Sequence, residues 1–103
     1  MNEFWDFQNA AGDDNAELYI YGDIVAEAPL WSDSVDAAKF SRELQDLGGK
    51  NVTVHINSQG GDVFVAHAIH NQLVAYSGNV NVVVDGIAAS AATIIAMAGT
   101  RIT

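Results

Sequence analysis

A serine at the start of a run of small residues is the first candidate for chemistry in this sequence. Ser90 follows Ala88-Ala89 and comes shortly after Asp85-Gly86, where a strand is expected to turn into a helix. A hydroxyl there lies where the helix dipole favours negative charge, and the N–H of the following Ala91 can hold a developing oxyanion. The pattern indicates a nucleophile; the alternative is a serine that only caps the helix.

A second turn offers a matching backbone donor. Gly60-Gly61 follows the alternating apolar segment Val52 to Ile56, and paired glycines permit positive φ angles and close approach of a substrate to the backbone. The Gly61 N–H, near the start of the next helix, is a second candidate oxyanion donor; the alternative is a plain tight turn. The Ser90 turn differs from the Gly-x-Ser-x-Gly elbow, because Ala88 and Ala92 replace its glycines, and the sequence has no phosphate-binding loop.

The elements that must position these turns alternate between strands and helices. The hydrophobic pattern predicts strands over residues 17–21, 51–56 and 80–84, and the last is so apolar that burial on both faces is expected. It predicts helices from Ser34 to the stop at Gly48-Gly49, over 62–76 and over 88–98, with Ser32, Asp33 or Ser34 as the first cap. Residues 101–103 begin a further strand. This order predicts an α/β fold with a parallel sheet and right-handed crossovers.

Composition excludes several classes of protein. A chain of 103 residues with 50% hydrophobic content supports one small domain. Thirteen acidic residues against four basic ones give a net charge of -9, which disfavours nucleic acid and anionic membranes as partners. The absence of cysteine excludes disulfides and thiolate metal sites, and the N-terminus lacks a signal-peptide pattern, so a soluble cytoplasmic protein is expected.

The N-terminus is expected to stand apart from the rest. Residues 1–15 hold three aromatic side chains and end in a linker-like stretch over 12–15, Gly-Asp-Asp-Asn. We therefore predict an N-terminal segment over residues 1–15 and a domain over residues 16–103.

Other titratable residues have simpler expected roles. His67 and His70 share a helix face, but no third ligand is spaced to complete a metal site, so surface roles are expected and no metal or cofactor is predicted. His55 alternates with inward residues and is expected to be a polar or partly buried strand residue. Asp62 is interpreted as a charge at a helix N-terminus and Asp85 as a turn residue, rather than as members of a catalytic triad.

Two segments together resemble the Clp protease family, the self-compartmentalising serine peptidases. They are residues 56–63, Ile-Asn-Ser-Gln-Gly-Gly-Asp-Val, and 85–92, Asp-Gly-Ile-Ala-Ala-Ser-Ala-Ala, and their separation also matches that family. Gln59 departs from the cellular enzymes, which have proline there. Residues 4–7, 17–22 and 55–58 look like the phage and prophage branch, the head-maturation proteases.

The resemblance implies a Clp protease/crotonase-like fold of repeated strand-strand-helix units with a mostly parallel sheet. It implies that Ser90 attacks a peptide carbonyl, and that the N–H groups of Gly61 and Ala91 hold the oxyanion. A histidine base and its acidic partner lie beyond the nucleophile in the family, at positions after Thr103, so this chain is expected to be the N-terminal part of the domain and inactive alone. Implied partners are a peptide or protein substrate, identical subunits in a ring, and an unfoldase or capsid proteins.

Two other functions stay open. One is a non-catalytic scaffold or pseudoprotease of the same fold, acting in capsid assembly. The other is an acyl-CoA enzyme of the crotonase group, which also uses two backbone N–H donors but has no serine nucleophile. The serine after Ala88-Ala89 disfavours the crotonase chemistry.

Overall fold

The computed structural model alternates strands and helices along the chain. It describes residues 4–9, 12, 14–22, 24, 35–99 and 101–102. The elements are, in order, β1 (Trp5–Gln8), β2 (Asn15–Tyr21), α1 (Val35–Gln45), β3 (Asn51–Ser58), α2 (Val63–Ala75), β4 (Val80–Ala88), α3 (Ala91–Ala96) and β5 (Arg101–Ile102). Each element expected from the sequence is present. The expected first caps, at residues 32–34, lie outside the described residues.

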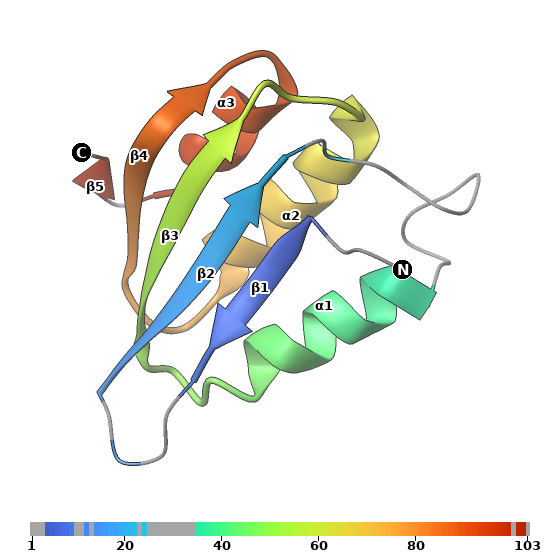
Figure 1. Cartoon of the computed structure of the whole chain (residues 1–103). Helices are drawn as coiled ribbons and strands as arrows, with labels where there is room; N and C mark the ends of the chain where they lie inside the picture. Colours follow the sequence, from blue (N-terminus) through green and yellow to red (C-terminus); the bar gives the residue numbers. More distant parts are fainter. Residues whose placement is uncertain are drawn as a thin grey trace.

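The strands form one mostly parallel sheet. Their order is β1-β2-β3-β4-β5, with β1 antiparallel to β2 and every later pair parallel (Figure 1). Parallel neighbours need a crossover, and α1, α2 and α3 each stand between two consecutive strands of the sheet. The predicted α/β class is confirmed.

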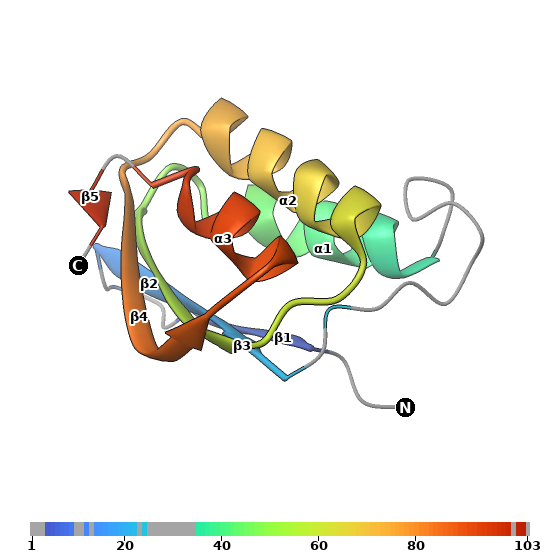
Figure 2. The same cartoon turned by 90° about the horizontal axis from the view of Figure 1, so that it is seen from above.

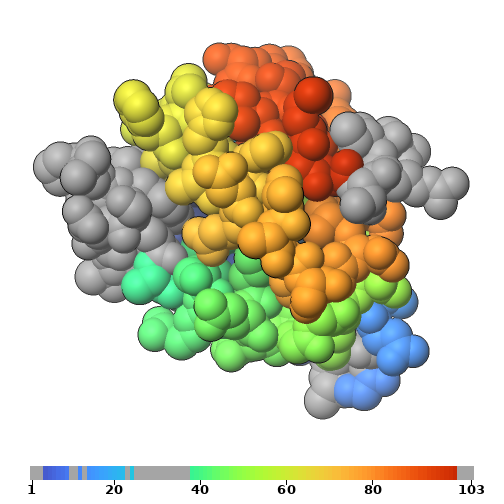
Figure 3. Space-filling view, turned by 180° about the vertical axis from the view of Figure 1, so that it is seen from behind, coloured from blue at the N-terminus to red at the C-terminus, as the bar shows by residue number. Residues whose placement is uncertain are grey.

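All three helices lie on the same face of the sheet. Seen from above, they form a layer on one side, and none of the helices in the described part of the chain lies on the opposite face (Figure 2). From behind, α1, α2 and α3 make up most of the visible surface of the described part (Figure 3). The alternation in β3 explains this arrangement, because its apolar positions, Val52, Val54 and Ile56, are fully buried and point toward the helix layer.

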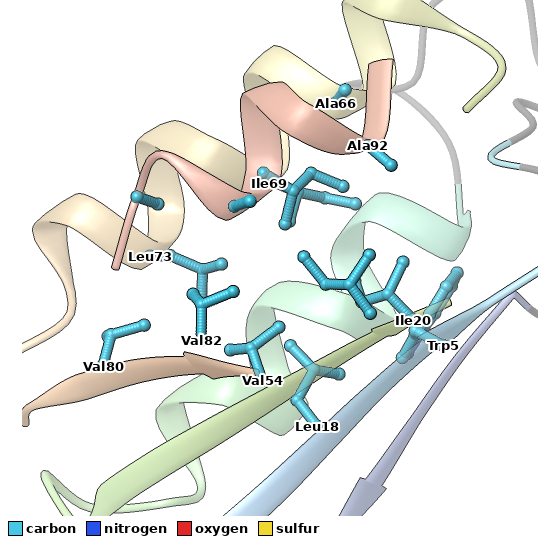
Figure 4. Close-up of a cluster of buried hydrophobic side chains, with 14 of the residues drawn as sticks. Trp5, Leu18, Ile20, Val54, Ala66, Ile69, Leu73, Val80, Val82 and Ala92 are labelled. Carbon is cyan, nitrogen blue, oxygen red and sulfur yellow. The ribbon is translucent and has the colours of Figure 1, made fainter. Parts of the chain in front are cut away.

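The core fills the space between the sheet and the helices. Leu18 on β2 and Val82 on β4 point toward Ile69 and Leu73 of α2 (Figure 4). Helix α2 begins at a cap in which Asp62 Oδ1 accepts a hydrogen bond of 3.1 Å from the Val65 N–H, as its place at a helix N-terminus predicts. The core therefore holds the carboxyl ends of β3 and β4 beside the starts of α2 and α3.

Strand β4 differs from the prediction that both of its faces are buried. Val80 and Val82 are buried, but Val83 and Val84 are only partly buried, and the strand continues to Ala88 through exposed residues. An apolar run indicates burial on two faces only when a second layer covers the sheet, and this sheet has helices on one face. The third helix is correspondingly shorter than predicted, since Ala88 belongs to β4.

The aromatic N-terminal residues belong to the sheet instead of standing apart from it. Strand β1 pairs with β2, with Trp5 opposite Ile20, and the side chains of Phe4 and Trp5 are buried in the core. Trp5 contacts the ring of Phe40 on α1 edge to face at 5.6 Å between ring centroids. These residues thus form an edge strand of the sheet and contribute side chains to its core. A domain boundary at residue 16 stays a prediction.

Candidate active site

The candidate active site is built on the sharp turn between β4 and α3. Ser90 has φ 52° and ψ −124°, the one positive φ at a residue other than glycine among those the structure describes. Such a conformation is strained for an L residue and occurs mostly at functional positions, including the elbow that presents a nucleophile between a strand and a helix. The Ser90 side chain is exposed. The turn therefore presents a hydroxyl to solvent on a short, constrained loop.

Ser90 occupies the N-cap position of α3 but does not act as a side-chain cap. Its hydroxyl makes no capping hydrogen bond; the first turn is instead closed by Ala92 N–H to Ala89 carbonyl at 3.0 Å and Thr93 N–H to Ser90 carbonyl at 3.1 Å. The Thr93 hydroxyl adds a bond of 2.6 Å to the same carbonyl. The interpretation of Ser90 as a helix cap requires its Oγ to accept from the next turn, and is therefore wrong.

The Gly60-Gly61 turn packs directly against this elbow. Gly60 has φ 111° and Gly61 has φ 145°, as expected for paired glycines. A Cβ on Gly60 would lie 2.8 Å from both the Ala89 carbonyl oxygen and the Ser90 Cβ, and 3.0 Å from the Ala91 nitrogen. The close approach explains the glycine, since any side chain there would push the two turns apart.

Gly61 is held on its other side by Ile24. The two residues form a parallel bridge in which the Ile24 N–H donates to the Gly60 carbonyl at 3.0 Å and the Asp62 N–H donates to the Ile24 carbonyl at 2.7 Å. Both hydrogen bonds of this bridge use groups of the flanking residues, Gly60 and Asp62, so the Gly61 N–H takes no part in it. Within the described residues, neither the Gly61 N–H nor the Ala91 N–H has a hydrogen-bond acceptor.

Two unpaired backbone donors and an exposed hydroxyl thus lie on turns that touch each other. This is the set of groups that acyl transfer needs, a nucleophile and two N–H groups for the oxyanion. The sequence singled out Ser90, Gly61 and Ala91. The structure brings the Gly60-Gly61 turn against the Ser90 turn, while their chemical roles stay a prediction.

Sequence reasoning missed two polar side chains that connect the turns, Asn57 and Ser58. The register of β3 and β4 shifts after Ile56, and the Asn57 side chain fills the irregularity, where its Oδ1 accepts from the Ile87 N–H at 3.3 Å. Ser58 is buried at 2% exposure. Its signal was present, because residue 58 continues the inward alternation of β3.

His55 lies on the open face of the sheet, in a cluster with two carboxylates. Its Nε2 is 2.9 Å from Glu17 Oε1 and its Nδ1 is 3.3 Å from Asp85 Oδ2, and its ring stacks on Tyr19 with 4.5 Å between centroids. Because both ring nitrogens face carboxylates, neither is available to take a proton from Ser90. As predicted, His55 is a partly buried strand residue.

Charge and hydrogen bonding set the protonation of this cluster. Burial lowers the pKa of His55, but its hydrogen bonds to Glu17 and Asp85 outweigh that effect, so the pKa lies above its usual value. The hydrogen bond from the Tyr21 hydroxyl, at 2.5 Å, is the main cause that holds the pKa of Asp85 below its usual value. Asp85 lies within β4, where it bonds Tyr21 and His55, and is not the turn residue predicted.

The other two histidines lie on α2. His67 is exposed, and His70 is half-buried with its Nδ1 3.3 Å from Asn71 Oδ1. In the described part of the chain, no three histidine, cysteine or acidic side chains gather as a metal site. No helix in that same part is long and apolar enough to cross a membrane.

Comparisons with known proteins show the family of this chain. The Clp protease family model matches residues 33–103. Two solved structures are similar to this chain, ClpP1 from Listeria monocytogenes and a point mutant of it. Each has 32% sequence identity to this chain, covers 81% of it and has a TM-score of 0.66. The chain spans 46% of the length of either ClpP1 chain. Curated protein sequences gave no match. Because the family model covers well over half of the sequence, the chain belongs to the Clp protease family.

Proposed function

We propose that the whole protein is a serine endopeptidase of the Clp type in which Ser90 is the nucleophile. The observation that supports this most is the backbone of Ser90, which has a positive φ while its exposed hydroxyl forms no cap. A serine that served only to start α3 would need neither the strain nor the free hydroxyl. Membership of the Clp protease family supports the same reaction.

In the proposed reaction, Ser90 Oγ attacks the carbonyl carbon of a peptide bond and passes its proton to a base. The N–H groups of Gly61 and Ala91 hold the negative oxygen of the tetrahedral intermediate. The intermediate collapses by breaking the C–N bond, and the leaving amine takes the proton from the base. Water then attacks the acyl-serine by the same steps and releases the carboxylic acid and the free hydroxyl.

The proposal needs a base that the described histidines do not supply. Both nitrogens of His55 are engaged by carboxylates, and His67 and His70 lie on the helix surface. We place the histidine and its acid after Thr103, as the family resemblance implies. A homo-oligomeric ring, protein substrates, a cytoplasmic location and a role in phage head maturation are further parts of the proposal that rest on that resemblance.

A fluorophosphonate probe tests the nucleophile. The protein expressed from its complete reading frame is incubated with the probe, digested and mapped by mass spectrometry, beside the variants Ser90→Ala and Ser77→Ala. Ser77 is an exposed serine at the far end of α2 and serves as the matched control. We expect covalent modification of Ser90, its loss in Ser90→Ala and its retention in Ser77→Ala, with peptide hydrolysis following the same pattern.

Other outcomes identify the alternatives. Unmodified Ser90, together with head proteins processed normally in the Ser90→Ala background, would favour a scaffold. Turnover of an acyl-CoA by the Ser90→Ala protein would favour crotonase chemistry. Either result would overturn the peptidase proposal.

A further inference from the structure

Ser58 has a polar side chain at an inward position of β3, where the other inward residues are apolar. It follows Val52, Val54 and Ile56 on the inward face of β3, and it is 2% exposed, the one buried polar side chain among the described residues. A buried hydroxyl is stable only when it is hydrogen-bonded. Its partners therefore indicate why serine occupies this position.

The Ser58 hydroxyl is satisfied in both directions. Its Oγ donates to the Gly22 carbonyl at 2.5 Å and accepts from the Gly60 N–H at 3.1 Å. The backbone carbonyl of the same residue accepts from the Ala89 N–H at 3.2 Å. One residue thus connects the end of β2, the Gly60-Gly61 turn and the residue before Ser90.

These connections act on the spacing of the two oxyanion donors. Gly60 touches Ser90 and Ala91 on one side, and its carbonyl is held by Ile24 on the other. The Gly22 carbonyl lies in the segment that leads to Ile24. The Ser58 hydroxyl therefore fixes the Gly60-Gly61 turn, while the Ser58 backbone carbonyl holds the turn that carries Ser90 and Ala91.

We infer that Ser58 is a positioning residue for the oxyanion hole, an inference that rests on the proposed function. The removal of its Oγ leaves the buried Gly60 N–H without its acceptor and the Gly22 carbonyl without the donor from Ser58. The Gly60-Gly61 turn then loses the bond that fixes its distance from the elbow. A small displacement of a donor weakens stabilisation of the transition state more than it weakens binding of the substrate.

The test compares Ser58→Ala with Tyr76→Phe in the full-length protein. The control also loses a hydroxyl that donates to a backbone carbonyl, because Tyr76 Oη bonds the Lys50 carbonyl at 2.6 Å at the opposite end of the sheet. Both variants are therefore expected to lose stability, and only Ser58→Ala is expected to lose catalysis. We expect kcat for peptide hydrolysis and the rate of phosphonylation of Ser90 to fall at least about tenfold in Ser58→Ala, with KM little changed, since one oxyanion donor is commonly worth about 10² or more in kcat.

A second variant and a second measurement cover the case in which Ser58→Ala does not fold. Ser58→Cys keeps the size of the side chain with a weaker donor, and its kcat is expected to lie between those of Ser58→Ala and the unsubstituted protein. Amide hydrogen exchange in the unsubstituted protein is expected to show the Gly60 N–H protected and the Gly61 N–H exchanging fast.

The results separate this inference from the proposed function. An unsubstituted protein that the probe does not modify at Ser90 would overturn the proposed function. A protein that is modified at Ser90, with Ser58→Ala reacting as fast as Tyr76→Phe or changing only KM, would overturn the positioning role alone. Fast exchange of the Gly60 N–H would contradict it as well.

Discussion

Replacement of Gly60 by alanine tests the contact on which the candidate site depends. The new Cβ would lie 2.8 Å from the Ala89 carbonyl oxygen and from the Ser90 Cβ, and 3.0 Å from the Ala91 nitrogen. All three are backbone atoms or a Cβ, so no side-chain rotation can relieve the overlap. The alanine would also have to adopt φ 111°, a conformation that L residues rarely take.

The structure sets the expected size of the effect. Backbone strain of this kind costs about 1–3 kcal/mol, and overpacking adds about 1–3 kcal/mol, so the free energy of unfolding should fall by about 2–6 kcal/mol. The turn that carries Ser90 must move away from the Gly61 turn. Because a displacement of about 1 Å can cost about 10² in rate, phosphonylation of Ser90 should slow by about that factor.

Gly48→Ala is the matched control. Gly48 also has a positive φ, 63°, but a Cβ there would meet no atom within 4 Å. It should therefore lose only about 1–2 kcal/mol from the left-handed backbone and keep the rate of phosphonylation. Urea unfolding gives the stabilities, and mass spectrometry of the Ser90 peptide over time gives the rates. If Gly60→Ala matches Gly48→Ala in both measurements, the two turns are not in the contact described.

Three further predictions follow from the described contacts. Ile69→Ala, which empties a fully buried position between α2 and the sheet, should lower the free energy of unfolding by about 2–5 kcal/mol in urea titrations; a loss under about 1 kcal/mol would contradict its place in the core. Asp62→Ala removes the cap of α2 and should cost about 0.5–2 kcal/mol, whereas Asp62→Asn should keep most of it, as thermal unfolding followed by circular dichroism would show. The pKa of His55 is raised in the folded state, so its contribution to the free energy of unfolding is fully present below the unfolded pKa of about 6.5 and is lost as the pH rises through the folded pKa. His55→Gln should flatten that part of the curve of unfolding free energy against pH. An unchanged curve would refute the pairing of His55 with Glu17 and Asp85.

The sequence was sufficient to predict the elements of the fold wherever a local hydrophobic pattern indicates which side chains are buried. The alternation of Val52, Val54 and Ile56 predicts both the strand and its inward face, and the same period extends to Ser58. The run from Val80 to Val84 led to a wrong prediction of burial on both faces, because apolar side chains do not show whether a second layer covers the sheet. Likewise, the aromatic residues near the N-terminus join the sheet because β1 pairs with β2, and no local sequence pattern predicts that pairing.

The residues of the candidate site could be proposed from the sequence, but the contacts between them could not. Ser90 and Gly61 could be chosen because the two segments that hold them, taken together with their separation, resemble the Clp protease family. The packing of Gly60 against Ser90 joins residues far apart in the chain, and no local sequence pattern reports such a contact. A helix cap and a nucleophile also have the same sequence pattern. Only the backbone angles and the missing capping bond separate them.

The most direct measurement is the structure of the full-length protein with a phosphonate bound covalently to Ser90. The proposed oxyanion hole predicts that the phosphonyl oxygen accepts hydrogen bonds from both the Gly61 N–H and the Ala91 N–H, at about 2.7–3.1 Å. A phosphonate attached to another residue, or one on Ser90 whose oxygen points away from these two donors, would contradict the assignment of Ser90 as the nucleophile of this site.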